Sequence, residues 1–493
     1  MNDYPTCDAT ELAARVRRGE VGPAELVDKA IASIEAVNPE LNAVVHRMYD
    51  EARAAARDLP DGPFRGVPMV VKDFDGFVKG HPWTAGSRFL EGFVPDHDSE
   101  AVARLRRAGL VLLAKTNLPE LGILGTTEGR LIGPARNPWN TGHSTGGSSG
   151  GSAALVASRA VPLGHGGDGG GSLRIPASAC GLVGLKTTRG RVTMAPDFGD
   201  VWGGYVSWGC LARSVRDAAA LVDVMAGPAP GDPYAAPPLE RPLAAEVDAP
   251  PGRLRVAFAA GSLFGKGTHP ECRAAVESAA RLLAGLGHEV EEARPEFDRE
   301  ALVRAYLVQV AAGVAAEIED MGRWAGRKPK AGYFEPATWF LCQIGRRLPA
   351  VELQKASDAA RTAGRALAAF FSRYDLLVTP TLAYPPVRLG ELALKPVEAA
   401  ALAVLRAAPV GGALKAVLAQ LADTSLEKTP NTQLFNQTGQ PAVSLPLHMT
   451  AGGLPVGVQL AARYGEDALL VRVSAQLERA KPWRDLVPAV AAP

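Results

Sequence analysis

Apolar runs of strand length alternate with longer helical segments along the 493-residue chain, and this alternation constrains its fold more than any other feature. The predicted strands are 66–74, 109–117, 256–261, 375–382 and two within 442–462, joined by a turn. The predicted helices are two within 10–35, with Thr10 as N-cap, then 152–160, 270–287 and 354–373. Alternating strands and helices pack in layers, so we expect an α/β fold.

Composition and charge exclude several classes of partner. The net charge is +1, with 47% hydrophobic and 21% charged residues, and no basic stripe is interleaved with aromatic residues. We therefore expect no nucleic-acid partner. The longest apolar stretch, 400–422, is interrupted by Arg406, Pro409 and Lys415, so we expect no membrane span either.

The cysteines and the N-terminus indicate a cytoplasmic protein. The five cysteines are odd in number, far apart and without a CxxC pair, so we expect neither a disulfide framework nor a zinc site. The first twenty residues contain no apolar core of a signal peptide. The cysteines are Cys7, Cys180, Cys210, Cys272 and Cys342.

A proline- and alanine-rich stretch at 227–252 is the strongest candidate for a break in the chain. Predicted strands lie on both sides of it, which favours a single sheet. We interpret it as a long surface connection and treat residues 1–493 as one domain.

Glycine and serine are concentrated in two neighbouring segments. "GGSSGGSAA" (146–154) continues directly into an apolar helical stretch, which a flexible linker would not do. "HGGDGGGSLRIP" (165–176) places five glycines around Asp168 and ends them at Ser172. Glycine lets a backbone adopt conformations that turn several N–H groups toward one point, as an oxyanion hole requires.

Two familiar short patterns occur in this region, and both lack their expected partners. Gly164, Gly166 and Gly169 match GxGxxG, but the stretch about 20 residues later is basic, where a dinucleotide site needs an acid. Gly146, Ser148 and Gly150 match GxSxG, which requires an acid and then a histidine further along. No downstream histidine lies in a persuasive motif, so the α/β-hydrolase esterase is kept only as an alternative.

A serine nucleophile can also use a neutral lysine as its base. Lys72 follows the apolar run "GVPMVV", where burial could lower its pKa toward the working pH. A second serine can relay the proton when the lysine does not reach the nucleophile. This interpretation accounts for Lys72 and both glycine–serine segments together.

The ordered set of motifs resembles the amidase signature family over nearly the whole chain. Segment 146–191 is similar to the family's signature, and the resemblance is weakest between about 225 and 430. The other matching motifs are "GVPMVVKD", "TAGS", "AKTNLPELG", "ARNPWN" and the C-terminal "FNQTGQPAVSLPL". The resemblance implies an α/β amidase signature fold, a large mixed central β-sheet covered by helices on both faces.

The resemblance also assigns the reacting groups. It makes Ser172 the nucleophile, Ser148 the bridging serine and Lys72 the base, with a cis Gly147–Ser148 peptide. It implies no cofactor and no metal.

Other residues take supporting roles by the same resemblance. The backbone of Gly169, Gly170, Gly171 and Ser172 would line the oxyanion hole. Gly122, like Ser148, would contact the substrate, and Asp168 and Arg174 would support the loop as an ion pair or by hydrogen bonds.

Two positions depart from the family pattern. Gly169 stands where threonine is common, and Thr187 replaces a usual proline, so the pocket is expected to be looser or reshaped. The chain resembles a bacterial branch of stand-alone amidases and aminohexanoate cyclic-dimer hydrolases. The expected small-molecule substrates are therefore neutral aliphatic or aryl amides, or linear or cyclic oligoamides, and a homodimer is expected.

The variable region 300–430 is expected to cap the substrate pocket. Its aromatic residues could line that cap, although core packing is the commoner role for such side chains. They are Tyr306, Trp324, Tyr333, Phe334, Trp339 and Phe340.

Two alternatives of other kinds remain open. One is the amidase subunit of a tRNA-dependent amidotransferase, although Ile175 stands where that subunit carries glutamine. The other is a non-catalytic binding protein, against which the intact Lys72, Ser148 and Ser172 argue.

Overall fold

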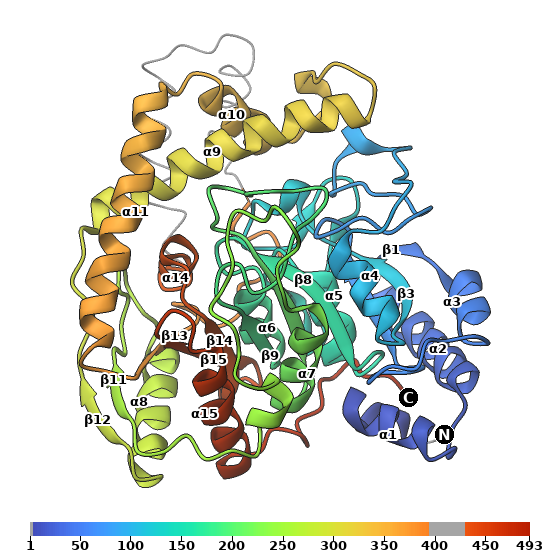
Figure 1. Cartoon of the computed structure of the whole chain (residues 1–493), viewed down its shortest axis with the longest axis horizontal. Coiled ribbons are helices and arrows are strands. Elements are labelled where there is room, and N and C mark those ends of the chain that lie inside the picture. Colours follow the sequence, from blue (N-terminus) through green and yellow to red (C-terminus); the bar gives the residue numbers. More distant parts are fainter. Residues whose placement is uncertain (1–2, 394–428) are drawn as a thin grey trace.

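A mixed sheet of eleven strands forms the centre of the computed structural model, which describes residues 3–393 and 429–493 (Figure 1). The strand order is β1-β3-β2-β8-β10-β9-β14-β15-β13-β11-β12. The strands are β1 (Val44–Arg47), β2 (Pro68–Lys72), β3 (Val111–Thr116), β8 (Leu163–Asp168), β9 (Val183–Lys186), β10 (Ser207–Ala212), β11 (Arg255–Phe258), β12 (Glu289–Glu292), β13 (Leu376–Pro380), β14 (Ala442–Met449) and β15 (Pro455–Ala462). β2 is parallel to β3 and β8, and β11 is parallel to β12 and β13, whereas the remaining pairs are antiparallel.

Helices cover both faces of the sheet. α5 packs against β2, β8 and β10, α6 against β9, β14 and β15, and α7 and α15 also pack on the sheet. The helices are α1 (Ala9–Arg17), α2 (Pro23–Leu41), α3 (Tyr49–Ala55), α4 (Glu100–Arg107), α5 (Gly150–Ala157), α6 (Arg174–Cys180), α7 (Val215–Met225), α8 (Pro270–Gly285), α9 (Arg299–Trp324), α10 (Pro336–Gly345), α11 (Ala350–Phe371), α14 (Gln433–Thr438) and α15 (Asp467–Ala480). The predicted α/β fold, a mixed sheet with helices on both faces, is confirmed.

Each predicted strand and helix is present, with small shifts at the ends. The prediction that Thr10 is the N-cap of α1 is wrong, because Asp8 is the N-cap residue and its side chain accepts the N–H of Glu11. The Thr10 hydroxyl instead donates to the buried carboxylate of Asp217, and hydrogen bonds to a charged acceptor are strong.

The proline-rich stretch at 227–252 is more than a surface connection. It contains the short 3-10 helix η4 (Leu243–Glu246), in which Leu243 and Glu246 are buried. Ion pairs from Arg241 and Arg472 hold Glu246 against the body of the protein.

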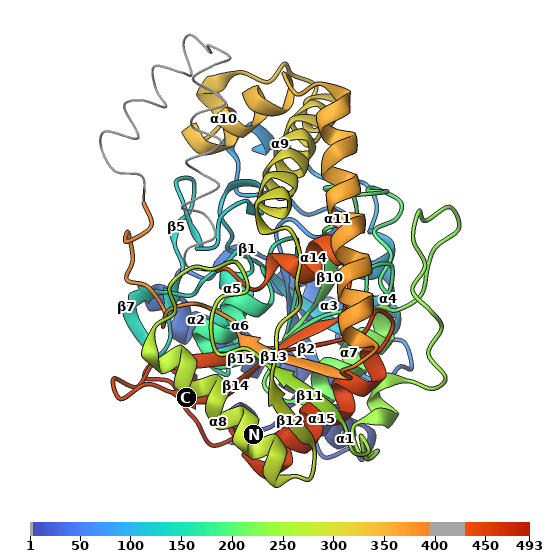
Figure 2. The ribbon, with the colours of Figure 1, turned by 90° about the vertical axis from the view of Figure 1, so that its left-hand side faces the viewer.

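α9, α10 and α11 rise above the sheet as a separate helical layer (Figures 1 and 2). They make up most of the described part of region 300–430, whose role as a cap stays a prediction, and 394–428 lies outside the described residues. Core packing accounts for several of its aromatic residues: Phe334, Trp339 and Phe340 are buried, and Trp324 stacks on Phe93. Tyr306 differs, because its hydroxyl reaches the glycine loop.

Among the described helices, only α9 is long and apolar enough to span a membrane by length and composition. Half of its most apolar window is buried within the protein. The apolar stretch at 400–422 lies outside the described residues.

The sheet order brings the chemically interesting residues to one edge. Lys72 is the last residue of β2, and Asp168 is the last residue of the neighbouring strand β8. Because these strands are parallel, their carboxyl ends meet on the same side of the sheet. The loop that leaves β8 carries Ser172 and then enters α6.

The close approach of α6 to β9 gives a test of the packing. A Cβ atom on Gly184 of β9 would lie 2.5 Å from the Cβ of Ala177 and 2.7 Å from the carbonyl oxygen of Leu173. Gly184→Ala should therefore lower the free energy of unfolding by about 1–3 kcal/mol in urea titrations. Gly285→Ala, in open space at the end of α8, should be neutral or stabilising by up to about 1 kcal/mol. Equal midpoints for the Gly184 variant and the unmodified protein would contradict this packing.

Candidate active site

Lys72, Ser148 and Asp75 form a buried polar cluster at the end of β2. Lys72 Nζ lies 3.0 Å from Ser148 Oγ and 2.8 Å from Asp75 Oδ2. The exposed fractions of the Lys72 and Asp75 side chains are 2% and 4%. Asp75 also accepts the backbone N–H of Gly167 at 2.6 Å, so its carboxylate fixes the lysine relative to β8. Lysine and serine are thus held in contact, away from solvent.

The two serines come from neighbouring turns. The Gly147–Ser148 peptide is cis, as predicted, and Ser148 lies two residues before α5, next to its N-cap residue Ser149. The Ser149 N–H donates to the carbonyl oxygen of Ser172 at 3.2 Å, which ties the two loops together. Ser172 is 9% exposed, and within the described ranges its hydroxyl makes no protein hydrogen bond. Its Oγ is therefore available to a ligand.

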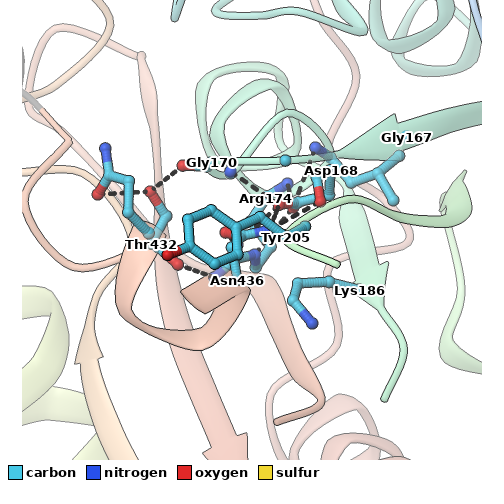
Figure 3. Close-up of polar contacts among 12 residues, drawn as sticks. Gly167, Asp168, Gly170, Arg174, Lys186, Tyr205, Thr432 and Asn436 are labelled. Carbon is cyan, nitrogen blue, oxygen red and sulfur yellow. Dashed lines mark hydrogen bonds and ion pairs between the residues drawn. The ribbon is translucent and has the colours of Figure 1, made fainter. Parts of the chain in front are cut away.

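A fully buried ion pair between Asp168 and Arg174 spans the loop that carries Ser172 (Figure 3). The guanidinium donates from Nε to Asp168 Oδ2 at 2.9 Å and from Nη2 to Oδ1 at 2.8 Å. Its remaining N–H groups bind Asn436, Gln459 and the carbonyl oxygen of Thr432, so all five guanidinium donors are used. Burial alone would raise the pKa of Asp168, but the charge and hydrogen bonds of Arg174 outweigh it and lower that pKa to about 2.

The backbone N–H groups of the glycine loop are not equivalent. Gly171 donates its N–H to Asp168 Oδ1 at 2.7 Å, so the expectation that it lines an oxyanion hole needs correction. The N–H groups of Gly169, Gly170 and Ser172 have no acceptor among the residues that the structure describes. Unpaired backbone N–H groups are rare in folded proteins, and these three lie together in the turn that ends at Ser172.

The glycines are required for two different reasons. Gly171 has φ +124°, a conformation that side chains strongly disfavour. Gly169 and Gly170 have no such angle, but a Cβ at these positions would lie 2.9 Å from the Trp202 ring and 2.1 Å from the Tyr306 hydroxyl. At Gly169, where threonine is common in the family, Trp202 thus occupies the space of the missing side chain.

Thr187, the second departure, is fully buried, and its hydroxyl donates to the carbonyl oxygen of Trp208 at 3.4 Å. The preceding Lys186 donates to the carbonyl oxygens of Thr187 and Gln440, both at 2.9 Å. Burial, with the charge of Arg174, lowers the pKa of Lys186 to about 7, yet among the described residues its hydrogen bonds go to these two carbonyl oxygens and to neither serine.

Gly122 lies against Ser148. A Cβ built on it would be 3.1 Å from Ser148 Oγ. Two residues earlier, the buried carboxylate of Glu120 accepts hydrogen bonds from Ser87 Oγ and the Glu335 N–H, both at 2.7 Å. Burial raises its pKa to about 7. Glu120 also lines a cavity of about 220 Å³ whose lining does not include Lys72, Ser148 or Ser172.

The two alternative sequence patterns do not fit this geometry. Gly164 and Gly166 lie within β8 rather than in a turn between strand and helix, as a dinucleotide fingerprint requires. Ser148 Oγ is hydrogen-bonded to Lys72, whereas a nucleophile elbow requires a hydrogen bond to a histidine. Among the described residues, no group of three or more histidine, cysteine or acidic side chains is placed to hold a metal ion.

Three important contacts were not anticipated from the sequence. Asp75 lies three residues after Lys72, a spacing that offered a local signal. Asn436 and Thr432 are more than 250 residues beyond the loop, and only the fold brings them to it. Asn436 does lie inside a family motif, which could have suggested a role.

The buried ion pair predicts a strong stability effect. Because the pKa of Asp168 is lowered from 3.8 to about 2, its stabilising contribution is present above about pH 4 and is lost as the pH falls toward 2. Arg174→Met should leave an unpaired buried carboxylate and cost about 3–5 kcal/mol at pH 7 in urea titrations. The loss should shrink at pH 4, where the stranded carboxylate takes up a proton more easily. Adding Asp168→Asn should recover part of it, and an additive double variant would contradict this coupling.

Sequence comparisons agree with this geometry. A family model described as Amidase matches residues 25–471. The 6-aminohexanoate-cyclic-dimer hydrolases of Pseudomonas sp. (strain NK87) and Paenarthrobacter ureafaciens are each 40% identical over 484 residues, covering 97% of this chain and 95% of the relative. The acylamidase of Rhodococcus erythropolis is 34% identical over 497 residues, covering 98% and 97% of the two chains.

Solved structures give the same result. A 6-aminohexanoate cyclic dimer hydrolase complexed with substrate superposes with a TM-score of 0.91 at 40% identity, covering 99% of both chains. A bacterial aryl acylamidase of the amidase signature family superposes with a TM-score of 0.84 at 27% identity, covering 98% of both chains. The chain therefore belongs to the amidase family and is an amide-hydrolysing enzyme.

Proposed function

We propose that the enzyme cleaves amides through an acyl-enzyme on Ser172, with Ser148 relaying protons between Ser172 and Lys72. The observation that carries this proposal is the buried 3.0 Å contact between Lys72 Nζ and Ser148 Oγ, next to the loop that presents Ser172. A serine hydroxyl needs a base to become nucleophilic, and lysine can act as one in its neutral form.

In the first step, Ser172 Oγ attacks the amide carbonyl. Its proton passes to Ser148 Oγ while the Ser148 proton passes to neutral Lys72. Asp75 holds the lysine nitrogen in position throughout. Both hydroxyl protons are thus accounted for, and Lys72 ends this step as an ammonium group.

The N–H groups of Gly169, Gly170 and Ser172 are the proposed donors to the tetrahedral oxyanion. They have no acceptor among the described residues, so they are free for one that forms during the reaction. One oxyanion donor is typically worth about 2.7–4 kcal/mol of activation free energy.

The relay then runs in reverse. Lys72 returns its proton through Ser148 to the nitrogen of the departing amine, which leaves as the C–N bond breaks. A water molecule loses a proton to the same relay, attacks the acyl-enzyme and releases the carboxylic acid. Ser172 is restored with its proton.

Neutral aliphatic or aryl amides, and linear or cyclic oligoamides, are the proposed substrates. The names of the relatives, a cyclic-dimer hydrolase and an acylamidase, support this class. The aromatic ring of Trp202 lies against Gly169 and the hydroxyl of Tyr306 lies against Gly170, so both neighbouring groups are neutral, which favours an uncharged acyl group beside the oxyanion loop.

The location and assembly are further proposals. All five cysteines are free and buried, which suits a reducing cytoplasm. A homodimer is proposed from the family resemblance and is measurable by light scattering. Co-purification with partner subunits would instead favour the amidotransferase alternative.

The relay is tested by labelling with a fluorophosphonate, followed by intact-mass analysis and peptide mapping. We expect one adduct on Ser172, formed about 10²–10⁴-fold more slowly in Ser148→Ala and Lys72→Met. Ser148→Ala is the cleaner variant, because it keeps the Lys72–Asp75 ion pair. His448→Ala, in a hydrogen bond to Glu271, is the control and should label at the normal rate. A label on Ser148 that is insensitive to Lys72 would refute the assignment.

The substrate class is tested with matched anilides. We expect turnover of the 6-aminohexanoate cyclic dimer and of a hexanoyl anilide. A succinyl anilide, with a carboxylate on its acyl group, should have kcat/KM lower by at least about tenfold, because aromatic rings cannot replace the solvation of its charge. Equal values for the two anilides would argue against an apolar acyl site.

A further inference from the structure

Each carbonyl oxygen of the loop before Ser172 has a hydrogen-bond donor. Asn436 Nδ2 donates to the carbonyl oxygen of Asp168 at 2.7 Å, and the Ile175 N–H donates to that of Gly171 at 2.7 Å. The Thr432 hydroxyl donates to the carbonyl oxygen of Gly170 at 2.6 Å (Figure 3). The Tyr306 hydroxyl reaches that of Gly169 only at 3.5 Å, which is a weak contact.

Fixing these oxygens fixes the opposite sides of the same peptides. In a trans peptide the C=O and N–H groups point in opposite directions within one plane. The peptide between Gly170 and Gly171 is held at both ends, by Thr432 on its oxygen and by Asp168 on its N–H. This peptide adjoins the two peptides that carry the free N–H groups of Gly170 and Ser172, so its orientation constrains theirs.

Thr432 makes this contact instead of a more usual one. It is the N-cap residue of α14, where a threonine hydroxyl normally accepts an N–H from the first turn of the helix. Its side chain makes no such capping bond. The fully buried hydroxyl is directed to Gly170, with a second, longer contact of 3.4 Å to the Gln433 side chain.

We propose that Thr432 is a positioning residue for the oxyanion hole, acting through the carbonyl oxygen of Gly170. Its hydroxyl holds the Gly170–Gly171 peptide, so that the N–H groups of Gly170 and Ser172 converge on the substrate oxygen. This inference rests on the proposed role of Ser172 as the nucleophile.

The helix that carries Thr432 is itself anchored to the loop. Arg174 donates to the carbonyl oxygen of Thr432 at 2.9 Å and to Asn436 Oδ1 at 2.6 Å. The hydroxyl is therefore presented from a rigid base, and the loop does not depend on a mobile side chain for its shape.

Matched threonine variants test the proposal. Thr432→Val replaces the hydroxyl with a methyl group of similar size, and Thr432→Ala removes it without placing a methyl group near Gly170. Thr432→Ser keeps the donor. Thr438→Val is the control, because Thr438 lies on the same helix and donates to the carbonyl oxygen of Leu434 at 2.7 Å, away from the loop.

Steady-state kinetics with an anilide and binding of a boronic acid analogue are the measurements. We expect kcat of Thr432→Val and Thr432→Ala to fall about 10–100-fold, because the donors are misplaced. KM should change less than about threefold, since the interaction is made in the transition state. Affinity for the boronic acid, whose tetrahedral adduct mimics that state, should fall in parallel with kcat. Thr432→Ser should recover most of the rate, and Thr438→Val should keep kcat within about twofold.

The outcomes separate this inference from the proposed function. If the unmodified enzyme is labelled at Ser172 but Thr432→Val and Thr432→Ala keep kcat and boronic acid affinity, the positioning role is wrong. An equal loss in Thr438→Val, or a loss confined to KM, also overturns it. If the unmodified enzyme is not labelled at Ser172, the proposed function fails and this inference fails with it.

Discussion

The ion pair between Asp168 and Arg174 is the interaction on which the rest of the site depends. Both groups are fully buried, so their attraction must offset the loss of two hydration shells. Hydrogen bonds contribute to this offset, because each N–H of the guanidinium has an acceptor. Since the two residues flank Ser172 in the sequence, their pairing forces the intervening loop into a compact turn.

The same pair joins parts of the chain that are distant in sequence. Arg174 starts α6, while its partners Gln459 and Asn436 belong to β15 and α14. All the hydrogen bonds of this buried cation can therefore form only when α6, α14 and the central strand β15 are packed together. The loop is thus held by groups of the protein itself, which suits the proposed oxyanion hole because its donors must not reorganise during the reaction.

Two neighbouring strands, β2 and β8, carry the polar groups of the site. β2 delivers the lysine, with its carboxylate partner Asp75 three residues later, and β8 delivers the loop. Asp75 also accepts an N–H from β8, so one carboxylate sets the distance between base and loop. At Gly169, where the chain departs from the family pattern, the ring of Trp202 fills the space that a larger residue would take.

The sequence alone determined the fold class and singled out the residues of the candidate site. Strand and helix periodicity predicted the layered sheet, and the ordered motifs singled out Lys72, Ser148 and Ser172, because these are local patterns of residue type and spacing. It could not determine which backbone N–H groups are free, since that depends on acceptors such as Asp168, whose direction is set by Arg174 and Asn436. It also gave the wrong reason for Gly169 and Gly170, where the neighbouring rings of Trp202 and Tyr306 decide, and not the backbone angle. Contacts of that kind, like the one from Thr432, exist only once distant segments have packed, so only the tertiary structure could decide them.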